Sequence, residues 1–128
     1  MNISKIWSEE LRQLVLHILS EPKTVYGYTH RPYMTTYQIA LAVKKHRPDI
    51  FEAAGKTLGG KGAGRNMFAA YLGKAIMDNF SPSQPESPIE YALLSHDYLV
   101  SVKFEDNVES SLIASKEAMV MFRLKEQP

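Results

Sequence analysis

The chain begins with hydrophobic residues that repeat at steps of three and four, which is the spacing of one face of an α-helix. The members of this stripe are Ile3, Trp7, Leu11, Leu14, Val15, Ile18 and Leu19. They predict a helix from Ser4 to Ser20, because Pro22 forbids its continuation. The segment from Glu21 to Met34, with Pro22, Gly27 and Pro32, is then expected to be a loop.

Three tyrosines of this loop, Tyr26, Tyr28 and Tyr33, lie among His30 and Arg31. Tyrosine rings beside basic groups can stack on nucleic-acid bases. The alternative is that the rings cover the neighbouring helices.

Thr35 and Gln38 have the spacing of a capping box, in which each side chain bonds the backbone N–H of the other residue. They predict a helix from Thr36 to His46, whose inner face carries Ile39 and Val43. After it, Pro48 suits the first position of a short helix from Pro48 to Ala54, and Gly55 suits its C-terminal cap.

A third long helix is predicted from Gly64 to Asn79, with Phe68, Leu72, Ala75 and Ile76 facing inward. Its other face carries Arg65, Asn66, Ala69, Ala70, Gly73, Lys74 and Met77. A face that opens with Arg and Asn and then stays small suits a helix that lies in a DNA groove. The alternative is that the small residues pack against another helix or a second copy of the chain.

The last third of the chain changes its pattern after the linker SPSQPESP. The segment from Ile89 to Leu94 is compatible with a short helix or a strand. Alternating hydrophobic residues predict strands from Tyr98 to Phe104 and from Met119 to Leu124, which pair most simply as an antiparallel ribbon.

The sequence thus predicts one α+β domain over residues 1–128, with three main helices followed by an antiparallel β ribbon. The expected core contains Trp7, Leu11, Leu14, Ile18, Ile39, Val43, Phe68, Leu72, Ile76, Val100, Val102, Val120 and Phe122.

The charges are unevenly distributed, although the formal net charge is only +1. From Val43 to Lys74 the chain has seven basic and two acidic residues, whereas after Met77 it has four basic and nine acidic ones. A positive field confined to one segment indicates a polyanionic partner such as nucleic acid.

A glycine-rich stretch, LGGKGAGRN from Leu58 to Asn66, lies inside the basic segment. Glycines let backbone N–H groups turn outward, and a following helix would add the positive end of its dipole. The order of a nucleotide-binding phosphate loop is absent, because Lys61 is followed by Gly62. A contact with DNA or RNA phosphates and a plain flexible connector remain as the two interpretations.

The order of these elements, together with MTTYQIALAV from Met34 to Val43, resembles the winged helix-turn-helix superfamily of DNA-binding domains. In that family the third helix enters the major groove and a β hairpin forms the wing. The resemblance implies duplex DNA as the partner, and a transcriptional regulator or an accessory protein of a mobile element as the function. The nucleic-acid-binding residues expected from the resemblance and the basic segment are Thr36, Tyr37, Gln38, Lys56, Lys61, Arg65, Asn66 and Lys74.

The alternative function is a non-enzymatic protein-interaction module that uses its acidic half around Glu105, Asp106 and Glu109. An acidic wing would be repelled by phosphate, which favours this alternative. Many winged helices dimerise, so a homodimer is also open.

Catalysis is not expected, because the chain has no cysteine and no motif of a hydrolase nucleophile or a zinc protease. We therefore expect no catalytic residue, no cofactor and no bound metal. Neither a signal peptide nor a membrane-spanning run is recognisable, which predicts a cytoplasmic protein without a membrane partner.

Overall fold

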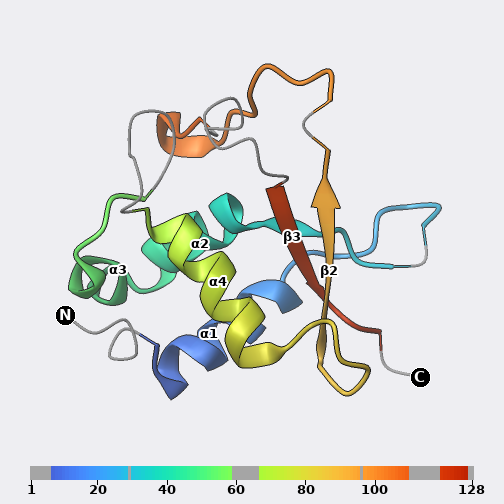
Figure 1. Cartoon of the computed structure of the whole chain (residues 1–128), viewed down its shortest axis with the longest axis horizontal. Helices are drawn as coiled ribbons and strands as arrows, with labels where there is room; N and C mark the ends of the chain where they lie inside the picture. Colours follow the sequence, from blue (N-terminus) through green and yellow to red (C-terminus); the bar gives the residue numbers. More distant parts are fainter. Residues whose placement is uncertain (1–6, 29, 59–66, 96, 110–118, 127–128) are drawn as a thin grey trace.

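The computed structural model describes residues 7–28, 30–58, 67–95, 97–109 and 119–126. These residues form an α+β arrangement of helices beside a small antiparallel sheet (Figure 1). The elements in chain order are α1 (Glu9–Ser20), β1 (Met34–Thr35), α2 (Thr36–His46), α3 (Pro48–Ala54), α4 (Phe68–Phe80), β2 (Ile89–Leu94), the 3-10 helix η2 (Glu105–Asn107) and β3 (Met119–Leu124). The predicted fold class is therefore confirmed.

The starts of α1 and α4 differ from the predictions. Helix α1 begins at Glu9 and not at Ser4, because the Ser8 hydroxyl caps it by accepting the N–H of Leu11. Helix α4 begins at Phe68 and not at Gly64, since Met67 has an extended backbone and forms a bridge with Thr57. The hydrophobic stripe of the first helix includes Trp7, which precedes α1, whereas the first inward-facing residue predicted for the third long helix, Phe68, is also the first residue of α4.

The predictions for α2 and α3 are confirmed. Thr35 accepts the N–H of Gln38 at 3.2 Å, and the Gln38 side chain accepts the N–H of Thr35 at 2.7 Å, which completes the capping box. Pro48 begins α3, and Gly55 ends it with a positive φ of 65°. Local chemistry alone determines these boundaries.

The sheet has the order β1-β3-β2, with both outer strands antiparallel to β3. Strand β2 pairs with β3 from Ile89↔Leu124 to Leu94↔Met119, which resolves the open choice for Ile89–Leu94 in favour of a strand. The predicted strand from Tyr98 to Phe104 is wrong. Among the described residues, β2 takes the place beside β3 that this segment was expected to fill, and Lys103 forms only an isolated bridge with Glu109.

The core lies between the helices and the inner face of the sheet. Most of the predicted core is buried, with Phe68 and Phe122 as its largest fully buried side chains. The burial of each such side chain away from water stabilises the fold by about 1.5–3 kcal/mol. Trp7, Leu14, Val102 and Val120 are partly buried against this core. Val100 is 77% exposed, so its assignment to the core is wrong.

Helix α4 approaches α2 and β3 very closely at Gly73. A Cβ atom on Gly73 would lie 3.0 Å from Thr36 Cγ2 and 3.5 Å from Val120 Cγ1. The absence of a side chain thus brings the backbone of α4 directly against the first turn of α2 and the strand behind it. Within the described residues, every helix is too short or too polar to cross a lipid bilayer.

Candidate nucleic-acid interface

The residues that flank the glycine-rich segment meet at the start of α4. The N–H of Phe68 donates to the Thr57 carbonyl at 2.7 Å, and the N–H of Ala69 donates to the Leu58 carbonyl at 3.0 Å. The described residues on the two sides of 59–66 are therefore joined to each other at the beginning of this helix. Of the predicted nucleic-acid contacts, Lys61, Arg65 and Asn66 belong to that segment and lie outside the described residues.

These two hydrogen bonds also change the anion site expected at this helix start. The first N–H groups of a helix have no partner within it and can bind an anion. Here Phe68 and Ala69 already give theirs to backbone carbonyls. The first turn of α4 has no acidic residue, so its positive dipole end still favours a negative charge nearby.

The exposed strip of α4 is narrower than the sequence predicts. Ala69 is only 1% exposed, and Gly73 packs against Thr36 and Val120. For these two residues the alternative of helix packing is correct, and the packing is within the chain. Ala70 and Lys74 remain exposed, and Lys74 forms an ion pair with Asp78 at 3.2 Å.

The start of α2 does not offer the side chains that the family resemblance implies. Thr36 and Tyr37 are both buried. The Tyr37 ring stacks on the ring of Phe104, with centroids 5.1 Å apart and planes 9° from parallel. Gln38 is exposed, but its oxygen is held by the capping box. Of the three, Gln38 is thus the one at the surface.

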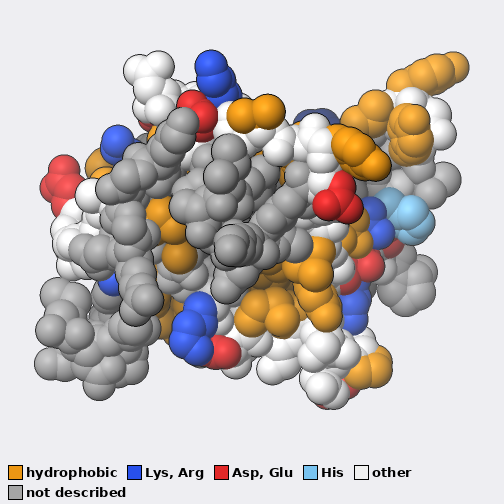
Figure 2. Space-filling model, turned by 45° about the horizontal axis from the view of Figure 1, so that its top comes forward, with side chains coloured by type: hydrophobic (Ala, Val, Ile, Leu, Met, Phe, Trp, Pro, Cys, Tyr) orange, Lys and Arg blue, Asp and Glu red, His pale blue; other side chains and the backbone are white. Residues whose placement is uncertain are grey.

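Carboxylates neutralise much of the basic field in the described residues. Lys45 pairs with Glu105, and this contact raises the pKa of the lysine and lowers the pKa of the glutamate. Arg47 bonds both oxygens of Asp49, which lowers the pKa of that carboxyl group, and it also reaches Glu10 at 3.3 Å. Basic and acidic side chains are interspersed on the face shown in Figure 2. The charge count of the basic segment included Asp49, but it did not include Glu10 and Glu105, which lie outside that segment.

All these pairs are exposed, so each one is weak. Exposed ion pairs contribute about 0–1 kcal/mol, since water screens the charges and the side chains lose freedom. A phosphate group can therefore compete with a carboxylate for any of these cations. Lys56, the remaining described residue of the predicted set, is half-buried beside α3 and interacts within the chain.

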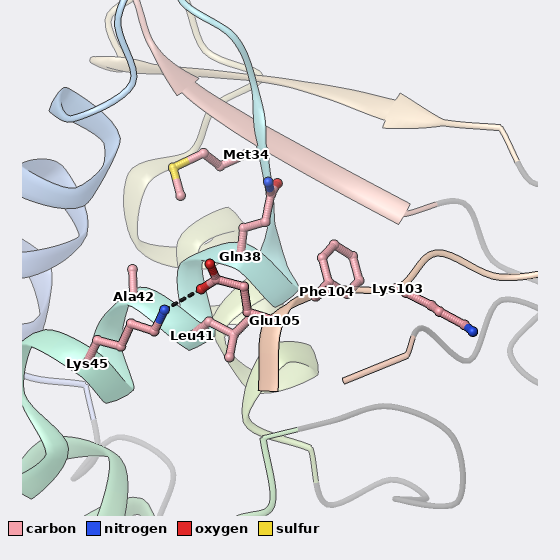
Figure 3. A pocket seen from close by; sticks show the side chains of 8 residues that line it. All are labelled: Met34, Gln38, Leu41, Ala42, Lys45, Lys103, Phe104 and Glu105. Atoms are coloured by element: carbon pink, nitrogen blue, oxygen red, sulfur yellow. Dashed lines mark hydrogen bonds and ion pairs between the residues drawn. The ribbon is translucent and has the colours of Figure 1, made fainter. Parts of the chain in front are cut away.

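A groove of about 450 Å³ separates α2 from the segment before η2. Figure 3 shows Met34, Leu41 and Ala42 on one wall and Phe104 with Glu105 on the other. The ion pair between Lys45 and Glu105 bridges its rim. This ion pair links the β2–β3 connection to α2 across the groove.

Two of the three loop tyrosines, which the sequence left open between base stacking and cover for the helices, are exposed. Tyr26 is 100% and Tyr28 is 72% exposed, in a turn closed by the hydrogen bond from the Tyr28 N–H to the Val25 carbonyl at 2.9 Å. Hydrophobic side chains project at the edge of the molecule where this turn lies (Figure 2). Tyr33 is half-buried, and the guanidinium of Arg123 lies 4.2 Å from the centre of its ring.

The sequence did not predict the exposed hydrophobic side chains of β2. Tyr91 is 39% and Leu93 is 61% exposed. Their alternation with Glu90 and Ala92 was the available signal, but Ile89–Leu94 was left open between a helix and a strand.

The chain matches no protein-family model, no curated protein and no solved structure. Among the described residues, no group of three or more His, Asp or Glu side chains is arranged to hold a metal ion. The proposal for its function therefore depends on fold arrangement, charge and exposure.

Proposed function

We propose that this domain binds nucleic acid, preferably duplex DNA, and that it acts without catalysis. The observation that carries the proposal is the position of the basic glycine-rich segment. Thr57 and Leu58, where the described chain enters this segment, accept hydrogen bonds from the first residues of α4, the third long helix among the described residues. In the winged helix-turn-helix arrangement this is the end of the helix that approaches the DNA bases.

The arrangement of the elements supports the same proposal by analogy of fold. Helices α1, α2 and α4 pack beside a sheet, and under this proposal its antiparallel pair β2–β3 would serve as the wing. Strand β1 pairs on the other side of β3. The additional helix α3 between α2 and α4 is a departure from the family pattern.

In the proposed contact, some residues bind phosphate groups and others bind bases. Lys61 and Lys56 would hold phosphate groups, which fixes register without reading sequence. Arg65 and Asn66 directly precede α4, and side chains of these types can bond base edges. Lys74 lies two turns further along the exposed strip, where a phosphate would compete with Asp78.

The test is fluorescence anisotropy of a labelled mixed-sequence duplex at low salt, with the whole chain and single variants. Lys61→Ala should weaken binding about equally for all sequences and lower the slope of log K against log salt by about one. Asn66→Ala should cost about 1–3 kcal/mol, mainly on the preferred sequence.

Lys23→Ala is the matched control, because Lys23 is an exposed lysine in the segment between α1 and β1, away from the start of α4 (Figure 1). It should leave the affinity unchanged. The nucleic-acid proposal is wrong if neither duplexes nor single strands bind at low salt.

The second candidate is a protein-interaction module. It is favoured by the β2–β3 connection, where the 106% exposed Tyr98 and the 77% exposed Val100 precede the acidic η2. Exposed hydrophobic side chains that closely precede Glu105 and Asp106 in the chain suit a basic protein partner. In that case duplex binding is absent at low salt, and Asp106→Lys abolishes partner binding.

A further inference from the structure

Strand β2 forms one outer edge of the sheet, and the hydrogen bonds around it show which backbone groups face outward. The N–H of Lys125 donates to the Pro88 carbonyl at 2.9 Å, directly beside the pair Ile89↔Leu124. In an antiparallel ladder, bonded and non-bonded residue pairs alternate. Even-numbered residues of β2 therefore bond β3, and odd-numbered residues direct their N–H and C=O groups to the outer edge. The outward residues are Ile89, Tyr91 and Leu93.

Of the outward-facing backbone N–H groups of β2, only the first has a hydrogen-bond partner within the described residues. The N–H of Ile89 donates to the Ser87 hydroxyl at 3.2 Å. Within the described part of the chain, the backbone groups of Tyr91 and Leu93 have no further hydrogen-bond partner. Their side chains are exposed as well. The edge thus offers bonding groups and hydrophobic surface at the same two residues.

Natural proteins usually protect such an edge with lysine, proline or a bulge. Strand β2, IEYALL, contains no lysine or proline, and its pairing with β3 is continuous. Its single charged residue, Glu90, lies 3.2 Å from the Nε atom of Arg123 on β3. The strand therefore presents no uncompensated charge that would repel another strand.

We propose that β2 pairs antiparallel with β2 of a second copy of the chain. An exposed strand edge is recognised by another strand, and two antiparallel copies present the same odd-numbered backbone groups to each other. A two-fold axis beside Ala92 places Tyr91 against Leu93 of the second copy, and Leu93 against its Tyr91. The four side chains then form one hydrophobic strip on the same face of a continuous sheet.

Self-pairing is favoured because the backbone groups of the strand are complementary to those of a second copy and no like charges meet. In this register Glu90 lies opposite Leu94 of the second copy, so the two glutamates do not face each other. The other sheet edge, β1, spans only Met34–Thr35 and continues directly into α2. Within the described residues, β2 is thus the longer edge available to a second copy. This inference is independent of the proposed nucleic-acid binding.

The test is sedimentation equilibrium of the whole chain at protein concentrations up to the millimolar range. The expected species is a dimer with twice the 14.5 kDa mass of the chain. Leu93→Lys should raise its dissociation constant more than about a hundredfold, because a lysine charge would enter the strip. Val25→Lys, at a residue that is 53% exposed in the α1–β1 loop, is the matched control and should leave the dimer intact.

Amide hydrogen exchange of the unmodified chain gives a second readout that does not depend on a variant. Protection of the Tyr91 and Leu93 N–H groups should rise with protein concentration, whereas the N–H groups of Glu90 and Ala92 are protected at all concentrations. A monomer at every concentration overturns the proposal. A dimer overturns it too if Leu93→Lys leaves that dimer intact or if the Tyr91 and Leu93 amides exchange freely.

Discussion

Gly73 shows how one missing side chain determines the contact between α2 and α4. A Cβ atom there would meet the methyl group of the buried Thr36 at 3.0 Å, which is closer than ordinary van der Waals contact. The replacement of glycine by alanine in a helix gains up to about 1 kcal/mol from propensity alone. Overpacking in a core costs about 1–3 kcal/mol. We expect the second effect to dominate, because Thr36 begins a capped helix and has little freedom to move.

Gly73→Ala should therefore lower the free energy of unfolding by about 1 kcal/mol in urea titrations. Thr36→Ser removes the contacting methyl group and is the background for a double-mutant cycle. On that background Gly73→Ala should become neutral or stabilising. If Gly73→Ala lowers the free energy of unfolding equally with Thr36 and on the Thr36→Ser background, the clash lies elsewhere.

Tyr71 is a buried residue whose hydroxyl group has no hydrogen-bond partner among the described residues. Burial raises the pKa of this phenol to about 12. Tyr71→Phe should leave the free energy of unfolding unchanged or raise it by about 1 kcal/mol, because the hydroxyl is desolvated without compensation. Tyr26→Phe at the surface is the control. A loss of more than about 1 kcal/mol would mean that the hydroxyl makes a hydrogen bond.

At the scale of elements, the long β2–β3 connection is attached to α2 by two contacts. One is the stacking of Phe104 on Tyr37, and the other is the ion pair of Glu105 with Lys45. Helix η2 starts directly after Phe104. The ion pair thus places the acidic η2 beside the basic end of α2.

This attachment should weaken in acid. The lysine holds the pKa of Glu105 below its ordinary value of 4.5. A lowered folded-state pKa means that the pair stabilises the fold above 4.5, and that this contribution is lost as the pH falls through the lowered value. The NMR shifts of the Tyr37 ring should therefore titrate below pH 4.5.

Glu105→Gln is the control for this titration, since it cannot ionise. The Tyr37 shifts of the variant should be flat over the same pH range. If they titrate as they do in the unmodified chain, another carboxyl group controls the attachment.

Sequence patterns predicted those elements whose boundaries depend on local chemistry. The Thr35 capping box and the αL glycine at Gly55 are complete within a few residues. The strand from Tyr98 to Phe104 failed because alternation does not reveal a competitor, and β2 takes the place beside β3. Strand pairing depends on residues far apart in the chain, so the pattern of a single segment does not show which strand it pairs with.

At the scale of the whole molecule, the chain folds so that its basic segment and its acidic C-terminal part partly neutralise each other. Lys45 of the basic segment pairs with Glu105 of the acidic one. The burial of Thr36 and Tyr37, and the internal packing of Gly73, could not be predicted because they depend on how α2 and α4 cross. The exposed strip of Ala70 and Lys74 agrees with the predicted outer face of α4.

The most direct test of the central proposal is a titration of the ¹⁵N-labelled chain with a mixed-sequence DNA duplex at low salt, followed by amide chemical shifts. If the domain binds nucleic acid as proposed, the largest changes will cluster in residues 56–74, at the glycine-rich segment and the exposed strip of α4. They will diminish as salt is added, because phosphate contacts release counterions. Unchanged spectra, or changes confined to β2 and the acidic residues 105–109, would contradict the proposal.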